Sequence, residues 1–297
     1  MKSHSNNPAV ERAQPWLGTL VSIRVAGLDA PNTHHAIDAA FEEIALVHRL
    51  MSFHDGTSDV SRLNCSSVGQ PVEVHPYTME VVRRALAFSA ASNGCFDVSV
   101  GAELVDWQFL PAPSGDAHAS GGSWRDIEIL PENRIAFHRP LWIDLGGIAK
   151  GFAVDRATER LRILGASQTV LNAGGDIRVQ GQIAEPVRLA VESASETMPV
   201  LELTDGSVAS SSGHRQRHWH NGHLYGPHVD GIRRMPAPTD RFVCVVAKDC
   251  VVADALTKIV MAKGIESVNL LQQFDASAYL HDPATGWQHL EGAVRAG

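Results

Sequence analysis

The chain has 297 residues, of which 44% are hydrophobic and 20% are charged, and its formal net charge at pH 7 is −8. This length and apolar content suffice for a folded globular protein with a large core. The negative charge and the lack of lysine and arginine runs argue against nucleic acid or an anionic membrane surface as a partner. No segment approaches the roughly 20 apolar residues that a membrane-spanning helix needs.

The four cysteines, at positions 65, 95, 244 and 250, follow no zinc-knuckle or CxxC spacing. A chain of this size does not depend on disulfides, so we expect reduced thiols. The first eight residues contain no apolar stretch of the kind found in secretory signals. These features predict a cytoplasmic protein, or a periplasmic one if a leader precedes the sequence given.

The first half of the sequence contains strand and helix signals in turn. Residues 22–25 have the composition of a first strand, and Pro31 introduces a helix with an apolar stripe from Ile37 to Met51. A polar turn follows at 54–59. A second helix begins at Pro76 and is expected to stop at Asn93-Gly94, a left-handed cap signal.

The second half is richer in strands. Residues 111–123 form a loop-rich excursion, and a helix then begins at Lys150 and ends at Gly165. The last predicted helix covers 251–261 and is closed by Gly264. The pattern predicts an α+β fold in which mostly antiparallel sheets pack with helices, and a single large domain over residues 1–297. Strand signals between these helices cluster at 168–172, 187–191, 200–203 and 242–247.

The segment from Asp144 to Gly151 reads Asp-Leu-Gly-Gly-Ile-Ala-Lys-Gly, an apolar strand end that runs into a glycine turn and then a helix. Glycines let a backbone approach a ligand closely, and the start of a helix presents unpaired N–H groups. Lys150 adds positive charge at the same point. The turn therefore indicates an anion site, most simply for a phosphate, although it matches neither a dinucleotide fingerprint nor a Walker loop. A purely structural turn is an equal alternative.

Asp254 lies within an almost wholly apolar helix, with Thr257 and Lys258 one turn further on. One interpretation is an Asp–Lys pair on an exposed stripe of that helix. The other is a carboxylate that binds Mg²⁺ beside a phosphate, because carboxylate oxygen is a preferred ligand of that ion. Periodicity alone does not separate the two.

Two further segments carry polar residues in glycine-rich surroundings. His228 precedes Val229, Asp230 and Gly231 in a segment that would display a catalytic histidine, although an inert loop histidine is the more common case. Residues 172–178 indicate a strand, a Gly-Gly turn and a second strand, which predicts a hairpin. Asp176 in that hairpin is positioned to orient neighbouring loops.

Taken in order, several motifs resemble the ApbE family, the FAD:protein FMN transferases, over roughly residues 13–286. They are Leu17-Gly18-Thr19, Met51-Ser52-Phe53-His54 with Ser61-Arg62-Leu63-Asn64, Gly94 to Gly101, Ile143 to Gly151, Asn172 to Asp176, Ser207 to Ser210 with Ser212-Gly213, and Ala253-Asp254-Ala255.

The resemblance implies a protein that binds FAD and, with Mg²⁺, transfers its FMN part to a serine or threonine hydroxyl of an acceptor protein, releasing AMP. His228 and Asp254 would then be catalytic, His228 as the proton acceptor and Asp254 as the principal metal carboxylate. The metal ligands would include backbone oxygen at Gly147, with Asp254 and a displaced Thr257. The residues implied in flavin-nucleotide binding are Leu17, Phe53, His54, Cys95, Phe96, Asp97, Asp144, Lys150 and Val229.

The sequence departs from the family pattern at three places. Lys258 stands where the family usually has a threonine, four residues after the metal aspartate, and Thr257 lies one place earlier. An ammonium group does not coordinate Mg²⁺ and repels it. Two alternatives follow with equal weight: Thr257 serves as a shifted ligand, or the lysine replaces the cation outright. The histidine loop lacks its usual proline, and Phe53 or His54 replaces a tyrosine.

The departures leave three readings of the function. The leading hypothesis is the FMN transferase. The second is an FAD- or FMN-binding paralogue that has lost transfer, which Lys258 favours. The third is an FAD pyrophosphatase that yields FMN and AMP with water as the acceptor.

Overall fold

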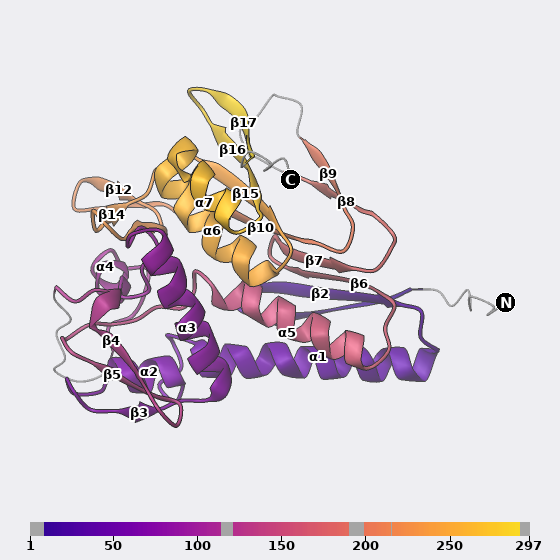
Figure 1. Ribbon diagram of the computed structural model, residues 1–297, viewed down its shortest axis with the longest axis horizontal. Coiled ribbons are helices and arrows are strands. Elements are labelled where there is room, and N and C mark those ends of the chain that lie inside the picture. Colours follow the sequence, from indigo (N-terminus) through magenta and orange to yellow (C-terminus); the bar gives the residue numbers. More distant parts are fainter. Residues whose placement is uncertain (1–8, 114–120, 190–198, 215, 292–297) are drawn as a thin grey trace.

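The computed structural model describes residues 9–113, 121–189, 199–214 and 216–291. A large antiparallel sheet with helices against it forms one part of the molecule, and a smaller group of helices and short strands lies beside it (Figure 1). Residues 114–120, the centre of the predicted excursion at 111–123, lie outside the described residues.

The central sheet has the strand order β1-β2-β6-β7-β10-β15-β16-β17, and each neighbouring pair is antiparallel. Its alternating burial is clearest in β2, where Val21, Ile23 and Val25 are fully buried. The strands are β1 Val10–Trp16, β2 Thr19–Ala26, β6 Gln168–Ala173, β7 Asp176–Gln180, β10 Ser207–Ser212, β15 Phe242–Ala247, β16 Ser277–Asp282 and β17 Gly286–Glu291.

Three long helices pack along this sheet: α1 Ala30–Met51, α5 Ala149–Ile163 and α6 Cys250–Lys263. Helix α5 contacts both of the others, α1 contacts β1 and β2, and α6 contacts β10 and β15 (Figure 1). The sequence explains their bounds locally. Asp29 accepts the amide of Asn32 at the start of α1, and Gly264 has a positive φ of 58° at the end of α6.

The smaller group places α2 and α3 beside the three-stranded sheet β3-β5-β4. Two hairpins and a two-stranded pair extend from other parts of the chain. The remaining elements are α2 Asp59–Asn64, α3 Pro76–Ala91, α4 Gly101–Asp106, α7 Val268–Gln273, η1 Trp124–Asp126, η2 Gly264–Ser267, β3 Val72–Glu73, β4 Ile127–Leu130, β5 Arg134–Phe137, β8 Glu185–Arg188, β9 Val200–Leu203, β11 His218–His220, β12 His223–Tyr225, β13 Val229–Asp230 and β14 Met235–Pro236.

The main apolar core joins residues from both parts of the molecule. The predicted stripe of α1 is buried within it, with Ile37 and Ile44 fully inaccessible to solvent. The same cluster includes Ile135 of β5 and Leu256 of α6. The α+β class with mostly antiparallel sheets is therefore confirmed.

Several local predictions were incomplete. Strand β1 was not predicted from the sequence. Leu17 and Gly18, which were expected to precede the first strand, form the turn of the β1–β2 hairpin. Helix α6 is not the last helix, because η2 and α7 follow Gly264. Strand β8 begins at Glu185, two residues before the predicted 187–191, and residues 190 and 191 lie outside the described part.

Candidate active site

A cavity of about 850 Å³ opens on this fold, and it gathers segments that are far apart in the sequence. Its walls come from the β1–β2 turn, the end of α1, the turn before α5, the β6–β7 turn and strand β10. Segments 96–98 and 227–229 also contribute, together with Lys258 of α6, and further lining comes from 109–110, 187–189 and 240–242. The volume falls within the range of small-molecule sites.

The turn from Asp144 to Gly151 lines one wall of the cavity. The Asp144 amide donates to the carbonyl of Val98 at 2.8 Å, and the Asp144 carboxylate accepts the amide of Gly146 at 3.2 Å. Burial raises the pKa of that carboxyl. A side chain at Gly147 would meet Phe96 and Lys258, with its Cβ 3.5 Å and 3.6 Å from their nearest atoms. These are ordinary van der Waals distances, so the turn at Gly147 lies next to both residues.

Lys150 is in the first turn of α5, and it lines the cavity. Its ammonium group donates to Asp176 Oδ2 at 2.5 Å and lies 3.6 Å from Asp254 Oδ1. Burial opposes the charged form, but the two carboxylates outweigh it and raise the pKa of Lys150 above its usual value. Lys150 is therefore a permanent cation, held by the hairpin residue Asp176.

The predicted pair of Asp254 with Lys258 forms, but Asp254 is completely buried on α6, so its predicted place on an exposed stripe is wrong. Its Oδ2 accepts the amide of Gly151 at 3.0 Å, and its Oδ1 accepts the ammonium of Lys258. Burial acts to raise the pKa of Asp254, yet Lys150 and Lys258 prevail and lower it. Thr257 is equally buried, and its hydroxyl contacts the Asp254 carbonyl at 2.7 Å and Ser211 at 2.8 Å.

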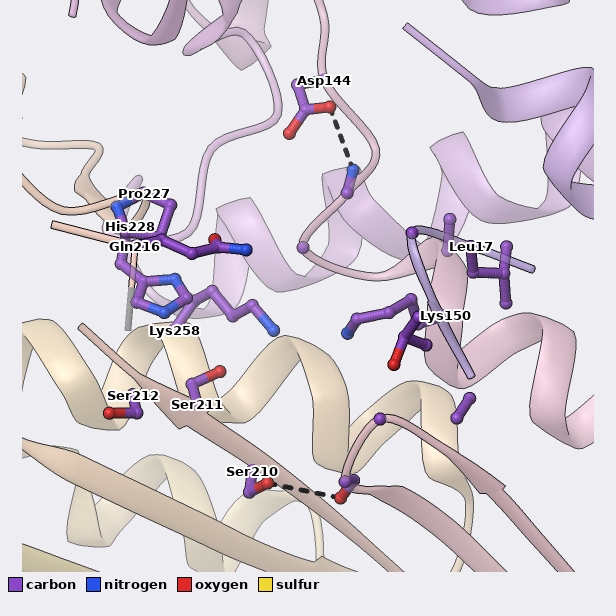
Figure 2. Close-up of a pocket in the computed structure, with 18 of the residues that line it drawn as sticks. Leu17, Asp144, Lys150, Ser210, Ser211, Ser212, Gln216, Pro227, His228 and Lys258 are labelled. Carbon is purple, nitrogen blue, oxygen red and sulfur yellow. Dashed lines mark hydrogen bonds between the residues drawn. The ribbon is translucent and has the colours of Figure 1, made fainter. Parts of the chain in front are cut away.

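Figure 2 shows Lys150 and Lys258 extending toward each other from opposite sides of the cavity. Ser210, Ser211 and Ser212 of β10 lie beneath them in this view, and Asp144 lies above. Because both ammonium groups approach the same oxygen of Asp254, the two positive charges converge on one end of the cavity.

His228 lines the cavity directly before β13, next to Val229, which also lines it. The carbonyl of His228 accepts the amide of Ala237 at 2.8 Å, which ties this segment to β14. Burial, together with the positive charges of Lys258 and Lys150, lowers the pKa of His228 to about 3. The imidazole is therefore neutral at physiological pH and able to accept a proton.

Five other residues of the predicted site also line the cavity: Leu17, Phe53, His54, Phe96 and Asp97. The carboxylate of Asp97 has a structural partner, because Arg234 donates to it at 2.8 Å. Cys95 does not belong to the lining: its side chain is 2% exposed, and burial raises the pKa of its thiol to about 11. Asp254 and Thr257 are likewise absent from the lining, and both are fully buried.

Two residues that hold the site together were not predicted from the sequence. Ser211 anchors Thr257, and Asp155 of α5 accepts the amides of Cys250 and Val251 at 2.9 and 2.8 Å. Neither has a local sequence signal, since each partner lies far along the chain. No disulfide joins the four cysteines, all of which lie in the described part of the chain.

An antiparallel α+β fold whose cavity combines apolar walls with two converging lysines defines a protein that binds an anionic, partly apolar small molecule. The sequence model of the ApbE family matches residues 17–280, and the chain belongs to that family.

The relatives agree with this assignment. The FAD:protein FMN transferase of Vibrio cholerae is 28% identical over 86% of this chain and 82% of its own length. The enzyme of the same name from Haemophilus influenzae is 27% identical over 76% of this chain and 70% of its own length. The crystal structure of the ApbE protein from Thermotoga maritima superposes with a TM-score of 0.84 at 25% identity, covering 96% of this chain and 97% of that one.

Proposed function

We propose that this chain is an FAD:protein FMN transferase, which moves the FMN part of FAD to a serine or threonine hydroxyl of an acceptor protein. The observation that carries the proposal is the pair Lys150 and Lys258 at one end of a cavity with apolar walls. The name borne by the relatives from Vibrio cholerae and Haemophilus influenzae supports it.

The character of the cavity suits the two parts of FAD. Phe53, Phe96 and Leu17 offer apolar contact to the aromatic rings. The diphosphate would lie at the two lysines, where the turn amides after Asp144 and the start of α5 add partial positive charge. Val229 and His54 extend the same lining.

In the proposed reaction the acceptor hydroxyl oxygen attacks the phosphorus of the FMN half. A new P–O bond forms to the acceptor, the P–O bond to the AMP phosphate breaks, and AMP leaves with that oxygen. Lys150 and Lys258 stabilise the charge that builds up on the diphosphate oxygens. The neutral imidazole of His228 takes the hydroxyl proton, and the negative charge of bound diphosphate raises its low pKa by offsetting the lysines.

Two alternative functions, a flavin-binding protein without transferase activity and a hydrolase, are compatible with the same cavity. The ion pair of Lys258 with Asp254 favours a binding protein that has lost transfer. A hydrolase would use the same cavity with water as the acceptor. A cytoplasmic location is part of the proposal, supported by the lack of a disulfide among the four cysteines. Within the described residues, none of the helices combines the length and apolarity needed to cross a bilayer.

Incubation of the purified protein with FAD, with and without an acceptor flavoprotein that carries a serine or threonine site, tests the function. AMP release together with flavin that stays on the acceptor in denaturing gels is the expected result. AMP release at the same rate without acceptor would identify a pyrophosphatase. FAD binding without any AMP release would overturn the transferase.

A further inference from the structure

The residues expected to hold Mg²⁺ already have other partners. The two oxygens of Asp254 accept Lys258 and the amide of Gly151, and Thr257 points at a carbonyl and at Ser211. Among the described residues there is no cluster of three or more His, Cys, Asp or Glu side chains that would hold a metal ion. This set of donors does not fit a divalent ion, because an ammonium group is no ligand and repels it.

The side chain of Lys258 lies between Asp254 and the turn that contains Gly147. This side chain is 14% exposed, and its Cγ and Cε lie 3.7 and 3.6 Å from the place where a Cβ on Gly147 would be. The stem therefore packs against the turn before α5, and the ammonium lies between this turn and Asp254. A second donation, to the Asp254 carbonyl at 3.2 Å, holds it in the same place.

The charges around this position balance without a metal. Two buried carboxylates, Asp176 and Asp254, face two ammonium groups, Lys150 and Lys258. Both lysines also line the cavity, whereas Asp254 does not. An anionic ligand that enters the cavity therefore meets the two cations first, and the aspartates serve to hold them.

We infer that the Lys258 ammonium takes the place of the divalent ion at the diphosphate end of the cavity, so that this chain binds and cleaves FAD without magnesium. The choice of FAD as the substrate in this inference rests on the proposed function. A fixed lysine is a weaker charge than Mg²⁺ but requires no metal to be recruited, and its three N–H groups are donors to phosphate oxygens.

The test measures FAD binding by calorimetry and AMP release, each in EDTA and in saturating Mg²⁺. For the natural chain, the FAD dissociation constant and the AMP rate are expected to agree between the two conditions. Lys258→Thr is expected to bind FAD about 10- to 100-fold more weakly in EDTA, the loss of one charge-assisted contact, with Mg²⁺ restoring binding. Mg²⁺ titrated without FAD is expected to bind Lys258→Thr and not the natural chain.

Two further variants serve as controls. Lys258→Arg keeps the charge and is expected to keep metal-independent binding, which guards against a folding failure of the threonine variant. Lys248→Thr makes the same substitution at an exposed lysine and is expected to change nothing.

The outcomes separate the inference from the proposed function. Loss of FAD binding or AMP release by the natural chain in EDTA, with recovery in Mg²⁺, would overturn the inference and leave the transferase intact. FAD binding that is indifferent to EDTA, without AMP release in either condition when the acceptor protein is present, would instead remove the transferase and the metal-free cleavage, and would retain only the lysine as the cation that binds FAD.

Discussion

The His228 imidazole is placed to accept a proton, since it lines the cavity beside Lys258 and is neutral. His228→Ala is expected to lower kcat by about 10²- to 10⁴-fold, the usual contribution of a general base, while FAD binding changes little. Single-turnover AMP release with FAD and acceptor measures it. His223→Gln on the exposed face of β12 is the matched control. Equal rates for His228→Ala and the natural chain would remove His228 from the mechanism.

The same histidine makes stability depend on pH. Its pKa is about 3 in the folded protein, below the ordinary value of 6.5, so the unfolded chain binds more protons between these values. The contribution is fully present above pH 6.5 and is lost as the pH falls toward 3. His228→Gln is expected to flatten the acid side of a plot of unfolding free energy against pH, by at most about 1.4 kcal/mol per pH unit. Parallel curves for the two proteins would contradict the assignment.

At the scale of elements, the crossing of α5 and α6 brings Lys150 and Asp254 together. Gly151 permits the close approach, because a Cβ there would lie 2.4 Å from the Cys250 carbonyl oxygen and 2.8 Å from Asp254 Cβ. Gly151→Ala is expected to lower the free energy of unfolding by about 1–3 kcal/mol, the cost of overpacking. Urea unfolding measures it. Gly56→Ala, where a Cβ meets nothing within 4 Å, is the control, and an equal effect of both would refute the packing argument.

The N-terminus of α6 is capped by a residue of another helix. Asp155 of α5 accepts two amides there, whereas Asp249 stands at the N-cap position without a side-chain bond. Asp155→Ala is expected to cost about 2–3 kcal/mol in urea unfolding, because two donors lose a buried carboxylate. Asp249→Ala is expected to change less than about 0.5 kcal/mol, as at ordinary surface sites. The reverse order of these effects would show that Asp249 is the true cap.

At the scale of the whole molecule, the cavity is lined by segments that are far apart in the sequence and that separate on unfolding. A ligand bound there therefore stabilises the folded state. FAD at 100 times its dissociation constant is expected to add about 2.7 kcal/mol of stability. At about 2–4 °C per kcal/mol, this corresponds to a rise in Tm of roughly 5–10 °C in a thermal scan. Riboflavin, which lacks the diphosphate, is expected to shift Tm less at the same concentration. Equal shifts would mean that the lysines do not contact the diphosphate.

The sequence alone determined the bounds of several helices and strands and indicated the chemical character of the site. Its periodicity fixed the buried stripe of α1, its caps fixed the ends of α3 and α6, and the turn from Asp144 to Gly151 indicated an anion site on local grounds. These properties depend on neighbouring residues, which a sequence shows directly.

Only the tertiary structure decided which polar residues meet. Gly151 and Asp254 are 103 positions apart, and Asp155 and Cys250 are 95 apart, yet each pair shares a hydrogen bond. Periodicity allowed Asp254 to be exposed or buried. The packing of α6 against α5 and β10 placed it in the interior, where a carboxylate needs a charged partner, and Lys258 became that partner.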